Sequence, residues 1–224
     1  MKSSNALIIQ SGGSTAVINR SLAGILTESL KLRSFSKIYG AIHGTNGLLK
    51  RNITDLSNIS SSDISLIADT PGAALGSSRY KITKSDASNI LNILSDFQIA
   101  YLFIIGGNDS AANVKELGRL SKYTGYKLQV IHVPKTIDND LVGTDHSPGF
   151  GSTARFISLA TMGAGKDAQT MGESAPITII EVMGRDAGWL AASSSLGKNN
   201  YQEPPHIVCV PEHITDHGHF VNQL

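Results

Sequence analysis

Six short apolar runs recur along the chain and alternate with longer segments of helical period. Each run has the length of a β-strand and is apolar nearly throughout, as expected for strands covered on both faces. The runs lie at residues 6–9, 38–42, 100–105, 128–133, 177–183 and 207–210. The intervening segments predict helices over 16–32, 86–94, 110–120, 152–162 and 187–195. This repetition predicts an α/β, doubly wound fold with a largely parallel sheet flanked by helices.

Composition narrows the class of protein. The 224 residues are 41% hydrophobic and 17% charged, which is enough for one large domain or two small ones with a buried core. A net charge of +1 argues against nucleic acid as a partner, and the first apolar run is too short for a signal peptide or a membrane span. The lone Cys209 fits a reducing, cytoplasmic compartment and is predicted to be a small buried side chain.

Ligands of such sheets bind beyond the carboxyl ends of the strands, so the loops there are the candidate site. The first loop contains Gly12 and Gly13, which let the backbone approach an anion, although a plain tight turn would have the same sequence. The second contains Asp109, which either caps the following helix or positions a metal ion or a phosphate. Neither loop decides the chemistry by itself.

The third loop is the most informative stretch of the chain. It places Lys135, Thr136, Asp138 and Asp140 within six residues after an apolar run. In an extended segment the two carboxylates point the same way, so one can hold Mg²⁺ while the other accepts a proton from an attacking hydroxyl. Lys135 supplies a cation near the transferring group. The pattern therefore favours phosphoryl transfer, and a solvated loop is the alternative.

Two further segments add candidate contacts to a substrate. Met183 either touches a substrate or packs, and Arg185 either binds a phosphate or pairs with Asp186. Arg79 follows a Gly-Ser turn and suits a bidentate phosphate contact, with an exposed salt bridge as the alternative.

Taken together and in this order, the motifs resemble the phosphofructokinase family over residues 6–212. The segments that carry the resemblance are Gly12-Gly13, Gly76-Ser77-Ser78-Arg79, Gly106-Gly107-Asn108-Asp109-Ser110, Pro134-Lys135-Thr136-Ile137-Asp138-Asn139-Asp140, Glu181-Val182-Met183-Gly184-Arg185 and Pro211-Glu212. The resemblance implies a donor-binding domain at 1–135 and an incomplete sugar-phosphate-binding domain at 136–224. Because the chain ends soon after Glu212, we expect the C-terminal part of that fold to lie beyond Leu224.

The resemblance also implies a role for each site residue. Asp138 is expected to be the catalytic base, with Lys135 beside the transferring group. The other expected sets are donor contacts at Gly13, Arg79, Asp109 and Ser110; fructose 6-phosphate contacts at Thr136, Asp140, Met183, Gly184, Arg185 and Glu212; and Mg²⁺ contacts at Asn108, Asp109 and Asp140. Two residues depart from the family pattern, since Asn108 replaces a usual aspartate and Pro176 an arginine found in many members.

Lys135 and Asp109 both resemble the pyrophosphate-dependent branch. A carboxylate at 109 would repel the α-phosphate of a nucleotide, and a lysine at 135 can neutralise a small, highly charged donor. We therefore expect a glycolytic phosphotransferase that acts at the 1-position of fructose 6-phosphate with pyrophosphate. An ATP-dependent 6-phosphofructokinase is one alternative, and a catalytically silent regulatory or phosphometabolite-binding chain is another. The resemblance further implies a homodimer or a homotetramer.

Overall fold

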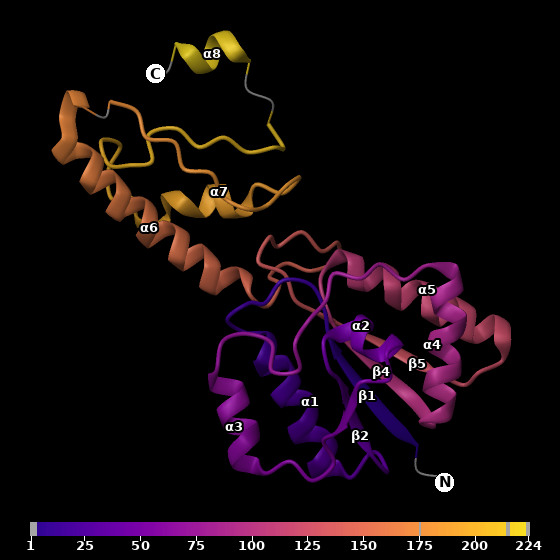
Figure 1. Ribbon diagram of the computed structural model, residues 1–224. Coiled ribbons are helices and arrows are strands. Elements are labelled where there is room, and N and C mark those ends of the chain that lie inside the picture. The colour runs from indigo at the N-terminus through magenta and orange to yellow at the C-terminus, as the bar shows by residue number, and fades with distance from the viewer. Residues whose placement is uncertain (1–3, 175, 214–215, 223–224) are drawn as a thin grey trace. The chain divides into compact units, whose positions relative to one another are not determined.

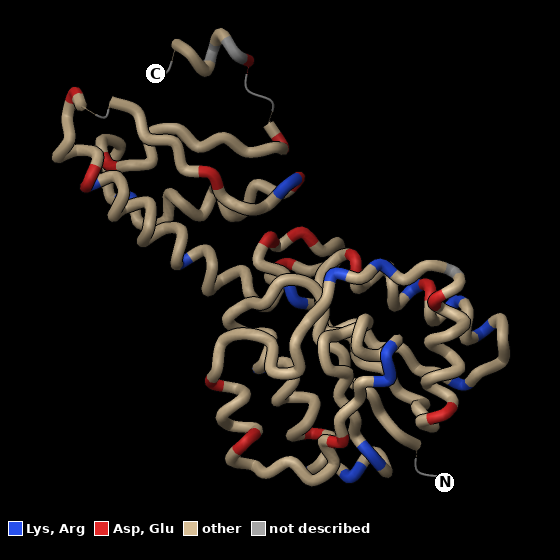
Figure 2. Tube along the Cα trace, in the orientation of Figure 1, with Lys and Arg blue, Asp and Glu red and all other residues tan. Residues whose placement is uncertain are grey.

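The chain forms two compact units, Met1–Lys135 and Thr136–Leu224, in a computed structural model that describes residues 4–174, 176–213 and 216–222. The first unit is a sheet covered by helices, and the second is built around one long helix (Figure 1). Acidic and basic residues are spread over several elements of the first unit (Figure 2).

The sheet of the first unit has five strands in the order β3-β2-β1-β4-β5. They are β1 (Asn5–Gln10), β2 (Ile38–Ala41), β3 (Ile53–Asp55), β4 (Ile99–Gly106) and β5 (Gln129–Pro134). All neighbours are parallel except β2 and β3, and the first, second, third and fourth predicted runs are therefore confirmed as β1, β2, β4 and β5. The strand order reverses at β1, which pairs with β2 on one side and β4 on the other. A ligand of an open α/β sheet binds at such a switch point.

Helices cover both faces of this sheet (Figure 1). One face packs against α1 (Ile18–Leu32) and α3 (Ser61–Asp69), and the other against α2 (Gly44–Leu49), α4 (Lys84–Asp96) and α5 (Asn108–Thr124). Alternate residues of β1 belong to different cores. Leu7 and Ile9 pack on the face covered by α2, α4 and α5, and Ile8 packs on the face covered by α1 and α3. Burying each of these side chains contributes about 1.5–3 kcal/mol. The predicted doubly wound α/β fold is confirmed.

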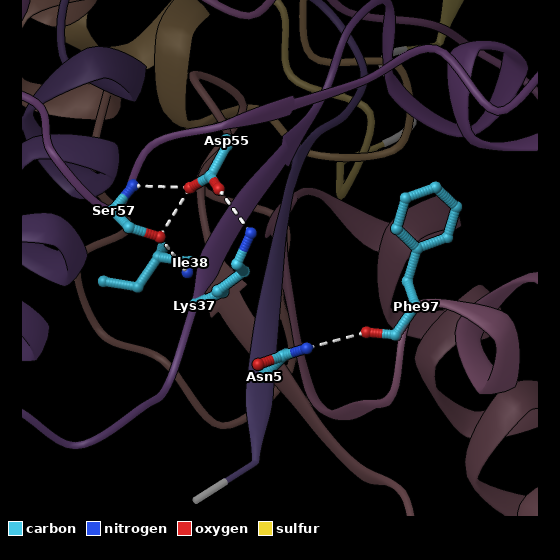
Figure 3. Close-up of polar contacts among 6 residues, drawn as sticks. All are labelled: Asn5, Lys37, Ile38, Asp55, Ser57 and Phe97. Atoms are coloured by element: carbon cyan, nitrogen blue, oxygen red, sulfur yellow. Dashed lines mark hydrogen bonds and ion pairs between the residues drawn. The ribbon is translucent and has the colours of Figure 1, made fainter.

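The edge strand β3 was missed by the sequence pattern because it has only three residues. Asp55 at its end accepts hydrogen bonds from the Ser57 backbone N–H (2.9 Å) and hydroxyl (2.5 Å) and from Lys37 Nζ (3.2 Å), as Figure 3 shows. These bonds, first of all those from Ser57, lower the pKa of the Asp55 carboxyl. The turn after β3 is thus fixed by side-chain bonds that no hydrophobic period reveals.

The second unit contains α6 (Phe150–Met171), η1 (Gly172–Ser174), α7 (Trp189–Ser193), η2 (Ser194–Gly197) and α8 (His217–Val221), with α7 and η2 packed on α6. The strands predicted at 177–183 and 207–210 are wrong, since neither segment is a strand in the described part of this unit. A strand needs a hydrogen-bonded neighbour, and the described residues supply none here. Ile179 is 88% exposed, and Cys209, predicted to be buried, is also exposed.

Candidate active site

The glycine loop after β1 is held by the segment that carries Arg79. The Gly12 N–H donates to Ser78 O (2.9 Å), and the Ser77 hydroxyl donates to Gly12 O (2.6 Å). Gly12 has φ +80°, which glycine adopts without strain. A Cβ on Gly13 would lie 3.1 Å from Arg79 Nη2, so the guanidinium rests against the bare backbone of this loop. The structure therefore brings two predicted donor residues, Gly13 and Arg79, together.

Lys135 follows β5 and reaches the same loop. Its side chain is only 4% exposed, and its Nζ donates to Gly13 O (2.6 Å) and Ser11 O (3.1 Å). Burying an ammonium group is costly unless it is hydrogen-bonded, and these two carbonyl groups offset part of that cost. The Lys135 ammonium is therefore a fixed positive charge that two hydrogen bonds hold against the glycine loop.

The loop between β4 and α5 holds the remaining donor candidates. The N-cap of α5 is Gly107, so Asp109 is not the capping residue but the second residue of the helix. Its carboxylate is exposed and forms an ion pair with Lys81 (3.5 Å), while Ser110 is buried. A Cβ on Gly106 would lie 2.0 Å from Ser110 Oγ, which explains the glycine there. Asn108 is exposed at the first position of α5, beside Asp109.

The loop after Lys135 folds back on itself through Thr136. Its hydroxyl donates to Asp140 Oδ1 (3.0 Å) and accepts from the Asp138 N–H (3.2 Å). Asp138 is 9% exposed, and Asp140 is partly buried. The premise that this segment is extended is wrong, because Asn139 lies between the two carboxylates with φ +55°. Asparagine tolerates this left-handed conformation better than most residues.

Asn139 is a structural residue that the sequence interpretation missed. Its Nδ2 donates to Asp145 O (3.1 Å), and its Oδ1 accepts from the Ser147 N–H (2.8 Å). Side-chain bonds of this kind are typical of asparagine in turns. An asparagine between two aspartates, followed by a glycine-containing loop, was the available signal.

The Met183-Gly184-Arg185 loop lies next to the Thr136 loop within the second unit. Arg185 Nη2 is 3.8 Å from Asp140 Oδ2, so the ion pair seen is with Asp140 rather than the neighbouring Asp186. Gly184 has φ +145°, and a Cβ there would lie 2.3 Å from Ala187 O. Met183 is 60% exposed at the start of this turn. Glycine is therefore required for the turn that presents Arg185.

Glu212 is tied to the same turn. Its Oε1 accepts from the Gly188 N–H (2.8 Å), although the side chain belongs to a segment more than twenty residues further along the chain. The second unit thus joins three of the predicted sugar-phosphate segments, at 136–140, 183–188 and 212.

The predicted Mg²⁺ contacts can be tested against the oxygen groups present. The described residues contain no group of three or more His, Cys, Asp or Glu placed to hold a metal ion. Mg²⁺ is commonly bound by one or two carboxylates together with water and substrate phosphates rather than by an all-protein cage. Asp140, Asp109 and the amide oxygen of Asn108 are hard oxygen donors of the required kind. Each of these groups, two in the first unit and Asp140 in the second, is of a kind that Mg²⁺ accepts as a ligand. Separately, no helix among the described residues is long and apolar enough to cross a membrane.

Comparison with known proteins places these loops in a family. Residues 5–224 match the family described as Phosphofructokinase. The pyrophosphate–fructose 6-phosphate 1-phosphotransferase of Rhodospirillum rubrum is 41% identical over 218 residues, covering 97% of this chain and 53% of that protein. The Halomonas elongata protein of the same name is 39% identical, covering 95% of this chain and 52% of that protein.

Solved structures agree with the sequence comparison. The pyrophosphate-dependent phosphofructokinase from Marinobacter aquaeolei superposes with a TM-score of 0.88 at 38% identity, covering 98% of this chain and 56% of that one. The chain thus spans about half the length of the relatives it matches. Because the family match extends over almost every residue and includes each of the loops described above, the chain belongs to the phosphofructokinase family.

Proposed function

We propose that this chain carries the donor site and the catalytic base of a phosphotransferase that transfers a phosphoryl group from pyrophosphate to the 1-position of fructose 6-phosphate. The observation that carries the proposal is Lys135, whose buried ammonium is held by Ser11 O and Gly13 O directly beneath the glycine loop. A fixed cation at this place favours a compact donor of high charge density. The names of the relatives support the same donor and acceptor.

The choice of pyrophosphate over ATP rests on Asp109 together with Lys135. Asp109 adds negative charge at the start of α5, where it is paired with Lys81. This charge disfavours the α-phosphate of a nucleotide, which pyrophosphate lacks. Arg79, beside Gly13, can donate two hydrogen bonds to a phosphate group of pyrophosphate. Gly13 leaves room for that approach, and the buried Ser110 hydroxyl lies at the first turn of the same helix as Asp109.

In the proposed reaction the oxygen of the 1-hydroxyl of fructose 6-phosphate bonds to a phosphorus of pyrophosphate. Asp138 accepts the proton that this hydroxyl loses. The bridging P–O bond of pyrophosphate breaks, and inorganic phosphate leaves with the electron pair. Thr136 orders this loop through its bonds to the Asp138 N–H and to Asp140. Phosphoryl transfer depends mainly on such positioning and on electrostatic stabilisation.

Bound Mg²⁺ would neutralise charge on the donor phosphates, and Asn108, Asp109 and Asp140 are the residues we propose to hold it. Met183, Gly184, Arg185 and Glu212 are proposed to bind fructose 6-phosphate, because the second unit gathers them with Asp140. The cytoplasmic location, the homo-oligomer and the absence of a nucleic-acid partner stay predictions.

A coupled assay of the whole protein with fructose 6-phosphate and Mg²⁺ tests the proposal, with pyrophosphate and ATP compared at equal concentration. We expect turnover with pyrophosphate and at most a small fraction of it with ATP. D138N, prepared in the same way, is the matched control, because it should lower either activity by about 10²–10⁴-fold without changing donor binding. Turnover with ATP alone would refute the donor assignment, and silence with both donors would refute the function.

A further inference from the structure

The segment at 70–83 joins α3 to α4 without any helix or strand of its own. Backbone N–H and C=O groups that are withdrawn from water need partners, and irregular segments of this length in compact domains commonly have a function. This segment carries Arg79. The source of its hydrogen bonds therefore determines how well Arg79 is positioned.

Two buried amide side chains hold the first half of the segment. Gln10, the last residue of β1, is 0% exposed, and its Oε1 accepts from the Leu75 N–H (2.9 Å) while its Nε2 donates to Asn19 Oδ1 (3.0 Å). Asn19, in the first turn of α1, is 2% exposed. It accepts from the Ala74 N–H (2.8 Å) and donates to Thr70 O (2.8 Å).

A third amide holds the second half. Asn113, on α5, is 7% exposed, and its Oδ1 accepts from the Ile82 N–H (3.3 Å) while its Nδ2 donates to Tyr80 O (3.3 Å). These side chains come from a strand and from two helices on opposite faces of the sheet. Their bonds reach the main chain on both sides of Arg79.

Between these two anchored stretches the segment contacts the glycine loop. Ser77 and Ser78 exchange hydrogen bonds with Gly12, and the Arg79 guanidinium then rests against Gly13. An uncharged amide supplies both a donor and an acceptor, so it can fix a backbone without adding charge near a bound anion. A carboxylate in the same positions would repel that anion.

We propose that Gln10, Asn19 and Asn113 are positioning residues that hold Arg79 in the orientation in which it binds the donor. None of the three is proposed to touch the donor itself. The inference rests on the proposed function in one respect, which is that the anion bound by Arg79 is pyrophosphate.

Amide hydrogen exchange tests the positioning itself, whatever the donor is. In Q10M the Leu75 amide loses its acceptor, and in N113L the Ile82 amide does, so each variant has its own reporter on a different side of Arg79. We expect exchange across residues 70–82 to be faster in each variant by about tenfold or more. Unchanged exchange in both folded variants would overturn the proposal.

Asn5 offers the matched control at the opposite end of β1. It is likewise a buried asparagine, and its Nδ2 donates to Phe97 O (2.8 Å), as Figure 3 shows. Asn5 is the first residue of β1, whereas the glycine loop follows the last. N5L removes a comparable buried bond and should lower the melting temperature by a similar amount. Exchange at 70–82 should stay as in the unsubstituted protein, and an equal rise there would mean that the effect is general loosening, which overturns the proposal.

Pyrophosphate binding to the whole protein, measured by titration calorimetry with Mg²⁺ present, tests the connection to Arg79. We expect Q10M to weaken binding about tenfold and N5L to leave it unchanged within twofold. In an R79A background Q10M should have no further effect, because residues that act as one unit are not additive. Additive losses would overturn the proposal. If the unsubstituted protein does not bind pyrophosphate, the proposed function fails, and the exchange measurements still decide whether the amides hold the segment.

Discussion

The contact between Gly13 and Arg79 gives a prediction that separates donor binding from folding. A Cβ placed on Gly13 lies 3.1 Å from Arg79 Nη2, closer than carbon and nitrogen ordinarily approach. Gly13 has no positive φ, so alanine is compatible with its backbone. The atom it meets is the end of a flexible side chain. G13A should therefore fold and should displace the guanidinium by a few tenths of an ångström.

The magnitude follows from the chemistry of the displaced group. A charge-assisted hydrogen bond from arginine to a phosphate contributes about 1.5–3 kcal/mol, and it depends on distance and direction. Losing roughly half to all of one such bond corresponds to about 0.75–3 kcal/mol, a range that includes the roughly 1.4 kcal/mol of a tenfold change in affinity. We expect the KM for pyrophosphate to rise by about that factor, with kcat and the KM for fructose 6-phosphate nearly unchanged.

Steady-state kinetics of the whole protein, with pyrophosphate varied at saturating fructose 6-phosphate, provides the measurement. The matched control is G24A, since Gly24 lies in α1 with nothing within 4 Å of the added methyl group. That substitution should raise the free energy of unfolding by about 0.5–1 kcal/mol and leave the kinetics alone. A folded G13A protein with an unchanged KM for pyrophosphate would refute the assignment of Arg79 to the donor.

Three other predictions address the base, the donor and a helix cap. D138N should lower kcat by about 10²–10⁴-fold with pyrophosphate affinity retained, as measured by single-turnover kinetics and calorimetry; near-normal kcat would exclude Asp138 as the base. D109G combined with K135G should shift the ratio of kcat/KM values from pyrophosphate towards ATP, and a constant ratio would contradict the donor argument. Hydrogen bonds from Thr83, the N-cap of α4, hold the pKa of Asp86 below its ordinary value of 3.8, so folding gains stability above that pH and loses it as the pH falls through the folded pKa. Urea unfolding at pH 6 and pH 3 should therefore show a smaller acid-induced loss in D86N than in the unsubstituted protein, and equal losses would mean that this cap does not contribute.

The hydrophobic pattern predicted β1, β2, β4 and β5 because their runs are apolar nearly throughout, most clearly in β1, where every residue is buried. Such strands are recognisable one at a time, without knowledge of their neighbours. The same pattern failed at 177–183 and 207–210, where Ile179 is largely exposed and no strand pairs with either segment in the described residues. A strand also requires a partner, and the apolar character of a run says nothing about where that partner is. Short elements such as β3 and α2 carry too few residues for a period to appear.

The residue types of the candidate site can be read from the sequence, whereas its geometry cannot. The segment at 135–140 is recognisable because a lysine, a hydroxyl and two carboxylates stand within six residues, whereas the glycine loop is not distinctive by itself. The contact of the Lys135 ammonium with Ser11 O and Gly13 O could not be predicted, since it joins residues more than a hundred positions apart. The left-handed Asn139 was open to prediction from its type, but its effect on the two neighbouring carboxylates required the backbone itself.

The position of Lys135 gives the proposed donor site a property that an exposed lysine would lack. An ammonium held by two carbonyl groups is already oriented before the donor binds. Little reorganisation is therefore needed when the negatively charged donor reaches the site. The same bonds restrain the side chain in this position. An arginine could not replace it, because a planar guanidinium is too large for a place where Nζ lies 3.3 Å from the position of a Cβ on Gly12. The buried amides of Gln10 and Asn19 act on the facing segment in the same way. Gln10, Asn19 and Lys135 are polar side chains that are costly to bury, and each is satisfied by hydrogen bonds to the glycine loop or to the segment that faces it.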